Sequence, residues 1–389
     1  MKFVIEAIGV KSGGGVELAL NLLRRLPRHR DHAFVVLVPD LPQYAEMAGS
    51  GQRVVRFPAH MGLVNRHFIL NREVPRICRD EAASALLCLG NFAPRRPACP
   101  AVVLLQNAWN VYDEPVAEKR LTLREKLTLL YGKRFYRRLP SHTRVVVQTS
   151  VMKERLASYH GLERSKIEVI PSAPPAFERP RPAARRTAAG AGEAFTFLCL
   201  SGYRAHKNLE VLVDSAKILR RLIPWPFRCL LTLSAGQHSG ARKLLARIRR
   251  EGLEDVLVNA GPVSRAELSR VCAQADACLL PTLLETVGFA YDEAMQFGLP
   301  ILTSDRDFAR ERCGNAATYF DPLHPESIAM AMASIMADDA LRARLVENGR
   351  DRLRQAPSWE DVAAQFVSVL EQAARNEKPL PQQAYALSF

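Results

Sequence analysis

Short apolar runs alternate with longer amphipathic stretches along most of this chain. A run of about four to eight apolar residues bounded by turn residues is typical of a buried strand, whereas apolar positions three and four residues apart predict a helix. The runs predict strands at residues 2–8, 33–38, 85–88, 101–105, 144–148 and 167–170 and, further along, at 195–200, 229–234, 256–259, 277–280 and 301–304. Helical stretches between them predict parallel sheets with helices on both faces.

This alternation is interrupted at residues 174–194, which are rich in Pro, Ala, Arg and Gly and lack periodicity. Such a composition is typical of an interdomain linker. It predicts one Rossmann-like domain at 1–173 and a second at 195–357. The expected fold class is therefore α/β, with two doubly wound domains that face a cleft. The last segment, 358–389, holds a predicted helix at 359–374 and a tail.

The charge balance narrows the choice of partners. The chain has 54 Lys and Arg against 40 Asp and Glu, a net charge of +14. This excess favours anionic partners, which include nucleotides, nucleic acids and anionic membranes. The 8 cysteines form no C-x-x-C pair and several lie inside apolar runs, as expected for buried thiols in a reducing compartment. No run approaches the roughly 20 apolar residues of a membrane span. We therefore expect a cytoplasmic protein.

Residues 281–300 carry the most informative pattern. Glu285 and Glu293 lie eight positions apart, after the predicted strand 277–280 and around the start of a predicted helix at 292–297. Ligands bind at the carboxyl ends of parallel strands, and a helix start there offers free N–H groups to an anion. Two carboxylates beside an anion site suit a ligand with both phosphate and hydroxyl groups, such as a sugar nucleotide. The alternative is a solvated acidic helix start.

The same residues carry a family resemblance. ETVGFAYDEAMQFGLPIL, at 285–302, is similar to the E-x7-E segment of the glycosyltransferase group 1 family, which has the GT-B fold. The matching positions are Glu285, Gly288, Glu293, Ala294, Met295, Gly298 and Pro300, while Val287 replaces the usual Phe. Ser358-Trp359-Glu360 also resembles the start of the family's last helix, which returns to the N-terminal domain. The resemblance implies a nucleotide diphospho-sugar as donor substrate, retention of anomeric configuration, and neither cofactor nor metal.

It also implies roles for individual residues. Glu293 is expected to accept hydrogen bonds from the ribose of the donor, and Glu285 to orient the donor sugar. The backbone amides of Val287, Gly288 and Phe289 are expected to face the leaving diphosphate.

A second stretch, SGYRAHKNLE at 201–210, follows the first predicted strand of the second half. Arg204 and Lys207 lie three residues apart in a turn that leads into a helix, where two cations can clamp a diphosphate. The alternative is a pair of surface charges. The resembled family has Arg and Lys in this turn, so Lys207 and Arg204 join Glu285 as expected catalytic residues. Arg204 lies closer to the lysine than is common in the family.

Three further positions complete the expected donor site. Gly14 and Gly15 lie in a glycine turn between strand and helix, where a phosphate can approach the backbone. Such turns are also common for structural reasons, but Gly14-Gly15-Val16-Glu17 matches the family pattern that borders the diphosphate and the acceptor. Val263 lies in a loop that resembles the family's base-binding loop. Asn107 lies near the position where many family members have a histidine that contacts the donor sugar. Its amide can form a hydrogen bond with a sugar hydroxyl but cannot act as a general base.

Two further motifs are relevant to metal binding and to membrane binding. Asp305-Arg306-Asp307 is a D-x-D sequence, which we interpret as loop carboxylates rather than a metal site. Residues 124–138 combine leucines and aromatic residues with Arg134, Arg137 and Arg138. A basic amphipathic helix of this kind can lie on an anionic membrane surface. The alternative is a surface helix whose apolar side faces the core.

Together these observations predict a retaining glycosyltransferase that moves a sugar from a nucleotide diphospho-sugar to a glycan or lipid-linked acceptor, in cell-surface polysaccharide or glycolipid synthesis. A GT-B epimerase-like enzyme remains an alternative. A nucleic-acid-binding protein would fit the charge, but the chain lacks an aromatic and basic recognition motif, so no specific nucleic acid is expected. A dehydrogenase is disfavoured because G-x-G-x-x-G is missing.

Overall fold

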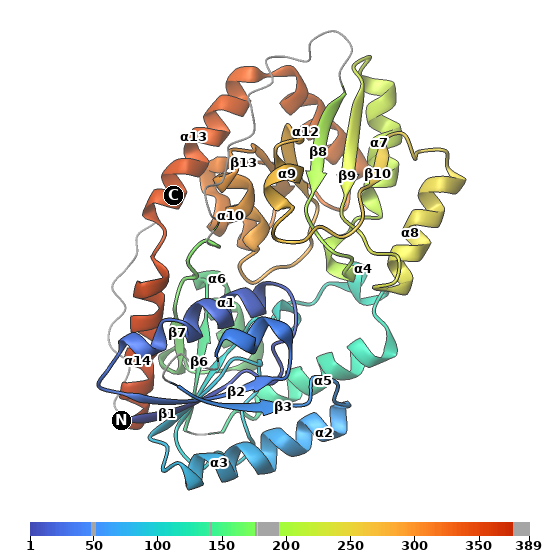
Figure 1. Cartoon of the computed structure of the whole chain (residues 1–389). Coiled ribbons are helices and arrows are strands. Elements are labelled where there is room, and N and C mark those ends of the chain that lie inside the picture. Colours follow the sequence, from blue (N-terminus) through green and yellow to red (C-terminus); the bar gives the residue numbers. More distant parts are fainter. Residues whose placement is uncertain (48–51, 141, 176, 178–193, 376–389) are drawn as a thin grey trace. The chain divides into compact units, whose positions relative to one another are not determined.

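The computed structural model describes residues 1–47, 52–140, 142–175, 177 and 194–375. The chain forms two compact units, each built around one parallel sheet (Figure 1). Unit 1 comprises Met1–Tyr112, Leu127–Ala173 and the described residues from Pro357, and unit 2 comprises Asp113–Lys126 and the described residues of Pro174–Ala356. Most of the expected linker and of the tail lie outside the described residues.

Unit 1 contains a seven-stranded sheet in the order β3-β2-β1-β4-β5-β6-β7, with all pairs parallel. Its strands are β1 (Lys2–Glu6), β2 (Ala33–Pro39), β3 (Arg53–Phe57), β4 (Ala85–Cys88), β5 (Ala101–Leu104), β6 (Thr143–Val147) and β7 (Ile167–Val169). Its principal helices are α1 (Gly14–Leu23), α2 (Leu63–Phe68), α3 (Val74–Asp80), α6 (Ser150–His160) and α14 (Trp359–Ala374). Helix α5 (Leu123–Arg137) begins in unit 2 residues and ends in unit 1 residues.

Helix α14 belongs to unit 1, although it is the last described helix of the chain. It packs against β4, β5 and α1. Ser358 and Asp361 form a capping box at its start, which satisfies two backbone N–H groups that the first turn leaves without partners. Glu371 near its end contacts the ring of His32, with Nε2 and Oε1 2.8 Å apart.

Unit 2 contains a six-stranded parallel sheet in the order β10-β9-β8-β11-β12-β13. Its strands are β8 (Phe195–Cys199), β9 (Phe227–Leu231), β10 (Leu257–Asn259), β11 (Ala277–Leu280), β12 (Ile301–Ser304) and β13 (Ala317–Phe320). Its helices are α4 (Pro115–Glu118), α7 (Val211–Leu222), α8 (Ser239–Arg250), α9 (Leu268–Cys272), α10 (Phe289–Gln296), α11 (Asp307–Cys313), α12 (Pro325–Ala337) and α13 (Asp339–Gln355). Both sheets confirm the predicted pair of doubly wound Rossmann-like domains.

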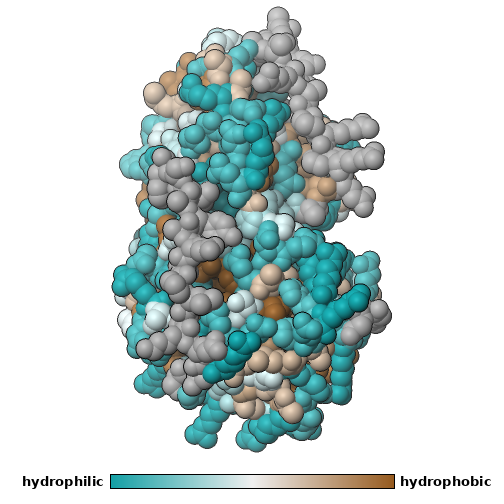
Figure 2. All heavy atoms as spheres, turned by 90° about the vertical axis from the view of Figure 1, so that its left-hand side faces the viewer, coloured by the Kyte–Doolittle hydropathy of each residue, from teal (hydrophilic) through white to brown (hydrophobic). Residues whose placement is uncertain are grey.

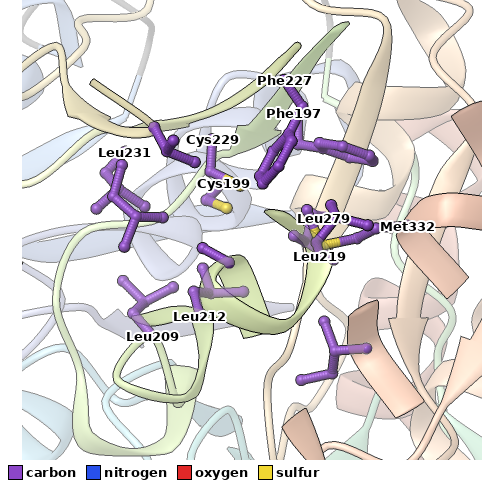
Figure 3. Packing of buried hydrophobic residues seen from close by; sticks show 14 of the residues in the cluster. Phe197, Cys199, Leu209, Leu212, Leu219, Phe227, Cys229, Leu231, Leu279 and Met332 are labelled. Atoms are coloured by element: carbon purple, nitrogen blue, oxygen red, sulfur yellow. The ribbon is translucent and has the colours of Figure 1, made fainter. Parts of the chain in front are cut away.

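The core of unit 2 lies between its sheet and the helices α7 and α12. Phe197 and Leu279 on neighbouring strands pack against Leu219 and Met332 from these helices (Figure 3). Each such side chain contributes about 1.5–3 kcal/mol when it is fully buried. This burial holds the central strands β8 and β11 in place. The two loops that follow these strands therefore begin from well-packed positions.

The two strands that the sequence did not predict are β3 and β13. Both lie at an edge of their sheet and are only partly buried, so their side chains do not form a continuous apolar run. Helix α10 begins at Phe289, three residues before the predicted start. Among the described residues, no helix combines the length and apolar character needed to cross a membrane. Most of the coloured surface in Figure 2 is hydrophilic, with hydrophobic residues scattered among the polar ones.

Candidate functional site

The candidate site lies at the carboxyl ends of β8 and β11, the two central strands of unit 2. The strand order of the sheet reverses between these strands, and open α/β sheets bind their ligands at this point. The loops that follow the two strands are joined through His206: its carbonyl oxygen accepts hydrogen bonds from the backbone N–H of Leu283 at 2.7 Å and from the hydroxyl of Thr282 at 3.3 Å. The predicted E-x7-E loop and the predicted Arg/Lys turn therefore lie side by side.

Lys207 and Glu285 form an ion pair between these two loops. Their side chains are only 19% and 14% exposed, so water screens the pair weakly. Thr282 donates a further hydrogen bond of 3.3 Å from its hydroxyl to Glu285 Oε1. Burial alone raises the pKa of Glu285, but Lys207 and the hydrogen bonds outweigh it and lower the pKa below its ordinary value. Glu285 is therefore ionised at neutral pH.

His206 stands next to this pair and is neutral at pH 7. Burial lowers the pKa of its imidazole from 6.5 to about 4, against the opposing charge of Glu285. Since His206 carries no charge at pH 7, Lys207 is the cation that keeps Glu285 ionised.

Arg204 is placed differently from Lys207. Its side chain is exposed, and Nη1 donates to the carbonyl oxygen of Tyr203 at 3.3 Å. The 3₁₀ turn Ala205–Lys207 begins after Arg204 and turns Lys207 toward Glu285. The structure thus brings Lys207 and Glu285 together and leaves Arg204 at the solvent-facing start of the turn.

Gly288 determines how α10 begins. It has φ of 69° and forms the N-cap of the helix, and a Cβ at this position would lie 2.6 Å from the ring of Tyr291. Only glycine fits both the left-handed backbone and the close ring. Val287 before it is 4% exposed and belongs to the core, whereas Phe289 after it is half-buried. The smaller Val is therefore accommodated as a buried residue where the family usually has Phe.

A buried ion pair, which the sequence analysis did not predict, holds helix α10 against α11. The carboxylate of Asp292, which is 2% exposed, accepts from Arg312 Nε at 2.8 Å and makes a second contact with Nη2. Burial raises the pKa of Asp292 despite the charge of Arg312. Arg352 then donates to the carbonyl oxygens of Arg312 and Glu311 at 2.8 and 2.7 Å. No local sequence pattern predicts these pairings, because α10, α11 and α13 meet only in the folded unit.

Glu293 follows Asp292 on α10 and is half-buried. Its charge adds to burial in raising the pKa of the thiols of Cys272 and Cys278, so it lies on the side of α10 toward α9 and β11. Glu285 thus occupies the predicted turn before α10, and Glu293 lies within the predicted helix.

The expected base-binding loop follows β10. The side chain of Asn259 accepts from Leu233 N at 3.0 Å and from Gly261 N at 3.3 Å, and it donates to Leu233 O at 3.2 Å. These bonds join the loops after β9 and β10. Gly261 has φ of 78° and Val263, two residues later, is half-buried. The loop is thus held in a defined shape next to the end of β10.

The D-x-D residues are engaged in local contacts. Asp305 forms a two-point ion pair with Arg310, at 2.7 and 2.9 Å, which lowers the pKa of its carboxylate. Asp307 Oδ1 accepts from Phe308 N at 2.8 Å at the start of α11. Across the described part of the chain, no group of three or more His, Cys, Asp or Glu is arranged to hold a metal ion.

The remaining expected residues lie in unit 1, at the carboxyl ends of β1 and β5. Gly13 has φ of 67° and Gly14 begins α1. A Cβ at Gly15 would lie 2.9 Å from Gln106 Oε1, so the glycine turn approaches the end of β5 closely. Asn107 Oδ1 accepts from Trp109 N at 3.2 Å and caps a short 3₁₀ turn. The glycines and the Gln106-Asn107 pair therefore form one edge of unit 1.

Comparison with known proteins agrees with this arrangement. Residues 181–352 match the family model "Glycosyl transferases group 1", and residues 12–173 match "Glycosyltransferase Family 4". The two matches fall on the two halves of the chain. The chain is a glycosyltransferase, and its second half matches the group 1 family.

Characterised relatives within this family are distant. The mannosylfructose-phosphate synthase of Agrobacterium fabrum is 25% identical over 243 residues, which are 58% of this chain and 52% of that protein. An MMP alpha-(1->4)-mannosyltransferase of Mycolicibacterium hassiacum is 30% identical over 34% of this chain and 32% of its own length. The chain thus spans between a third and about half of the length of these relatives.

Solved glycosyltransferase structures share the whole fold. The sucrose-phosphate synthase of Thermosynechococcus elongatus matches with a TM-score of 0.71 and 15% identity, covering 97% of this chain and 100% of that one. HepE of Anabaena, solved in complex with UDP-glucose, matches with a TM-score of 0.69 and 16% identity over 96% of this chain and 100% of its own. These neighbours identify the fold as GT-B.

Proposed function

We propose that this group 1 glycosyltransferase transfers a sugar, with retention of configuration, from a nucleotide diphospho-sugar to a hydroxyl group of a glycan or lipid-linked acceptor. The observation that carries the proposal is the Lys207–Glu285 ion pair at the carboxyl ends of the two central strands of unit 2. It supplies a cation for the diphosphate and a carboxylate for the sugar, next to a helix start. HepE, which shares the fold, was solved with such a donor bound.

The leaving diphosphate gains negative charge in the transition state, so groups that already point toward it lower the barrier. We assign this role to the Lys207 ammonium and to the backbone N–H groups at 287–289 before and within the first turn of α10. Arg204, whose side chain is exposed, is free to turn toward an outer phosphate oxygen. Glu285 orients the donor sugar, and Glu293 accepts from the ribose. Since Lys207 supplies the positive charge, we propose that no metal is required.

The acceptor is assigned to unit 1. The close approach of Gly15 to Gln106 supports this, because a turn without side chains exposes backbone N–H groups to a hydroxylated ligand. Asn107 remains assigned to the donor: its amide is offered to a hydroxyl of the donor sugar in place of the histidine of other family members.

Membrane contact is a second element of the proposal and rests on unit 1. Helix α5 exposes Leu127 and Leu130, at 54% and 65%, among Arg134, Arg137 and Arg138. Helix α2 lies beside it through His67 and Tyr131, whose ring centroids are 6.0 Å apart, and exposes Phe68. Exposed apolar residues among cations suit the cytoplasmic face of an anionic membrane, where a lipid-linked acceptor for cell-surface glycan or glycolipid synthesis is found.

The test is a thermal-shift screen of the full chain against UDP-, GDP- and ADP-sugars, followed by a transfer assay with the stabilising donor. We expect one nucleotide class to stabilise the protein and the product to keep the anomeric configuration of the donor by NMR. Activity is expected to survive a chelator; activity that is lost and then restored by magnesium or manganese would contradict the metal-free assignment. Conversion of the donor without transfer to any acceptor would favour the epimerase alternative.

A further inference from the structure

Residues Asp113–Lys126 belong to unit 2, although the chain on both sides of them belongs to unit 1. This segment contains α4 and the first turn of α5. We call Asp113–Lys126 the strap. Its sequence carries no pattern that predicts an association with the second domain, and the expected domain boundaries placed it in the first.

The strap contacts three loops at the carboxyl edge of the unit 2 sheet. Glu114 Oε2 lies 3.6 Å from Arg306 Nη2, after β12. Arg120 Nη1 lies 2.8 Å from Glu210 Oε2, after β8, and Glu125 Oε2 lies 3.7 Å from His238 Nε2, after β9. The strap therefore lies along the edge at which the proposed donor site is found.

The central contact of the strap reaches the turn that presents Lys207. Arg120 Nη1 also donates to Asn208 Oδ1 at 3.1 Å, and Asn208 directly follows Lys207. Asn208 is 2% exposed and has φ of 53°, a left-handed conformation that is uncommon outside glycine. Its Nδ2 donates to the carbonyl oxygen of Pro322 at 2.8 Å. The side chain of Asn208, which ends the lysine turn, is thus held on one side by the loop after β13 and on the other by Arg120 of the strap.

Glu210 extends this support to the beginning of the turn. Its carboxylate accepts from Arg120 and from the hydroxyl of Tyr203, and the Tyr203 ring stacks on His238 at 5.0 Å with an interplanar angle of 19°. His238 in turn faces Glu125 of the strap. The turn from Tyr203 to Asn208 is therefore held at both ends by groups that depend on the strap.

We propose that the strap preorganises the diphosphate-binding turn, and that Arg120 is a positioning residue that acts through Asn208 and Glu210 on Lys207. This inference rests on the proposed function, which assigns the diphosphate to Lys207. A cation held in place before the ligand arrives loses less conformational entropy on binding, and small displacements of such groups are costly. The chain on both sides of the strap belongs to unit 1, but the strap itself is part of unit 2, and we propose that it sets the geometry of the donor site there.

The first test needs no ligand. Hydrogen exchange of the backbone amides at 203–209 is compared in the wild type, Arg120→Ala and Lys119→Ala. Lys119 is the neighbouring exposed cation of the strap, so its variant removes the same charge without touching Asn208 or Glu210. We expect faster exchange in Arg120→Ala than in Lys119→Ala, and intermediate exchange in Arg120→Lys, which keeps the charge but not the guanidinium group whose Nη1 reaches both Asn208 and Glu210. Equal exchange in Arg120→Ala and Lys119→Ala overturns the proposal.

The second test measures affinity for the nucleoside diphosphate of the donor class found in the thermal-shift screen, and for its nucleoside, by calorimetry. We expect Arg120→Ala to weaken the diphosphate by about tenfold and the nucleoside by less than about twofold, because only the diphosphate uses Lys207. In a Lys207→Ala background, Arg120→Ala should cause no further loss. Full additivity of the two losses overturns the proposal, since Arg120 would then act independently of the turn.

These experiments distinguish a failure of the proposed function from a failure of the strap proposal. If the wild type binds no nucleoside diphosphate, the proposed function fails, while the exchange experiment still decides whether Arg120 orders the turn. If the wild type binds and Arg120→Ala binds equally well, the strap proposal fails and the proposed function stands.

Discussion

The ammonium group of Lys207 donates a hydrogen bond to the carboxylate of Glu285, which lies 78 residues later in the sequence. Each partner ends up in this position because its loop follows a central strand of one sheet, and β8 and β11 pair directly. The pair is largely shielded from water, with side chains 19% and 14% exposed. Each charge therefore depends on the other, and a diphosphate bound as proposed would compete with Glu285 for Lys207.

Removing Glu285 should separate these two roles. We expect Glu285→Ala to reduce turnover by at least about a hundredfold if it orients the sugar, whereas nucleoside diphosphate binding should be kept or slightly strengthened, because Lys207 is released from its partner. Steady-state kinetics with the donor sugar and calorimetry with the nucleoside diphosphate measure the two effects. Parallel losses in both would show that Glu285 supports the diphosphate turn rather than the sugar.

Glu293 should contribute to donor binding through its charge. Glu293→Gln keeps the size of the side chain but replaces a charge-assisted hydrogen bond, which is worth about 1.5–3 kcal/mol, or roughly ten- to a hundredfold in affinity. The loss should appear equally for the nucleoside and the nucleoside diphosphate, since the ribose is common to both. Glu326→Gln on α12 serves as a control that changes a carboxylate elsewhere in unit 2. Unchanged affinity in Glu293→Gln would remove the ribose assignment.

His206 should make stability depend on pH. Its pKa is about 4 in the folded protein and 6.5 in its ordinary state, so below pH 6.5 the unfolded chain takes up a proton that the folded chain does not. The free energy of unfolding should therefore fall as the pH is lowered from 6.5 to 4, by up to about 3 kcal/mol from this group. The charges that act on His206 are those of Glu285, Lys207, Arg204 and Glu125.

Urea unfolding at a series of pH values measures this dependence. His206→Gln cannot take up the proton and should flatten the curve between pH 6.5 and 4. His324→Gln is the matched control, because His324 lies in the same unit with its side chain 69% exposed. The same slope in wild type and His206→Gln would mean that another group dominates in this range.

Unit 1 should bind anionic vesicles in a salt-dependent manner. We expect sedimentation with phosphatidylglycerol vesicles at low salt and release as salt rises. The reason is that dissolved ions reduce the distance over which surface charges attract one another to about 8 Å at physiological ionic strength. Changing Arg134, Arg137 and Arg138 together to Gln should abolish binding, as should Leu127→Ser with Leu130→Ser, while donor binding by unit 2 persists.

A matched variant controls for net charge in this experiment. Arg242, Arg249 and Arg250 are exposed on α8 of unit 2, and their joint change to Gln removes the same charge from a different surface. This variant should still sediment with vesicles. Wild-type protein that ignores the vesicles at low salt would point to a soluble acceptor.

The central strands and the local placement of Glu285 and Glu293 were predictable from the sequence. β4, β11 and β12 coincide with their predicted ranges, because central parallel strands are buried on both faces and appear as continuous apolar runs. The position of Glu285 in a turn and of Glu293 in a helix also followed from the local pattern. Edge strands such as β3 were missed because one side of them faces water and their apolar run is broken.

The contacts that shape the site were decided only by the tertiary structure. Asp292 and Arg312 meet across two helices, and Arg120 reaches Asn208 from a segment whose neighbours in sequence belong to the other unit. Apolar periodicity reports which residues of a segment are buried, but it carries no information about which distant segment will cover them. The order of the strands in each sheet decides which loops become neighbours. It thereby determines which charged side chains from separate loops form pairs.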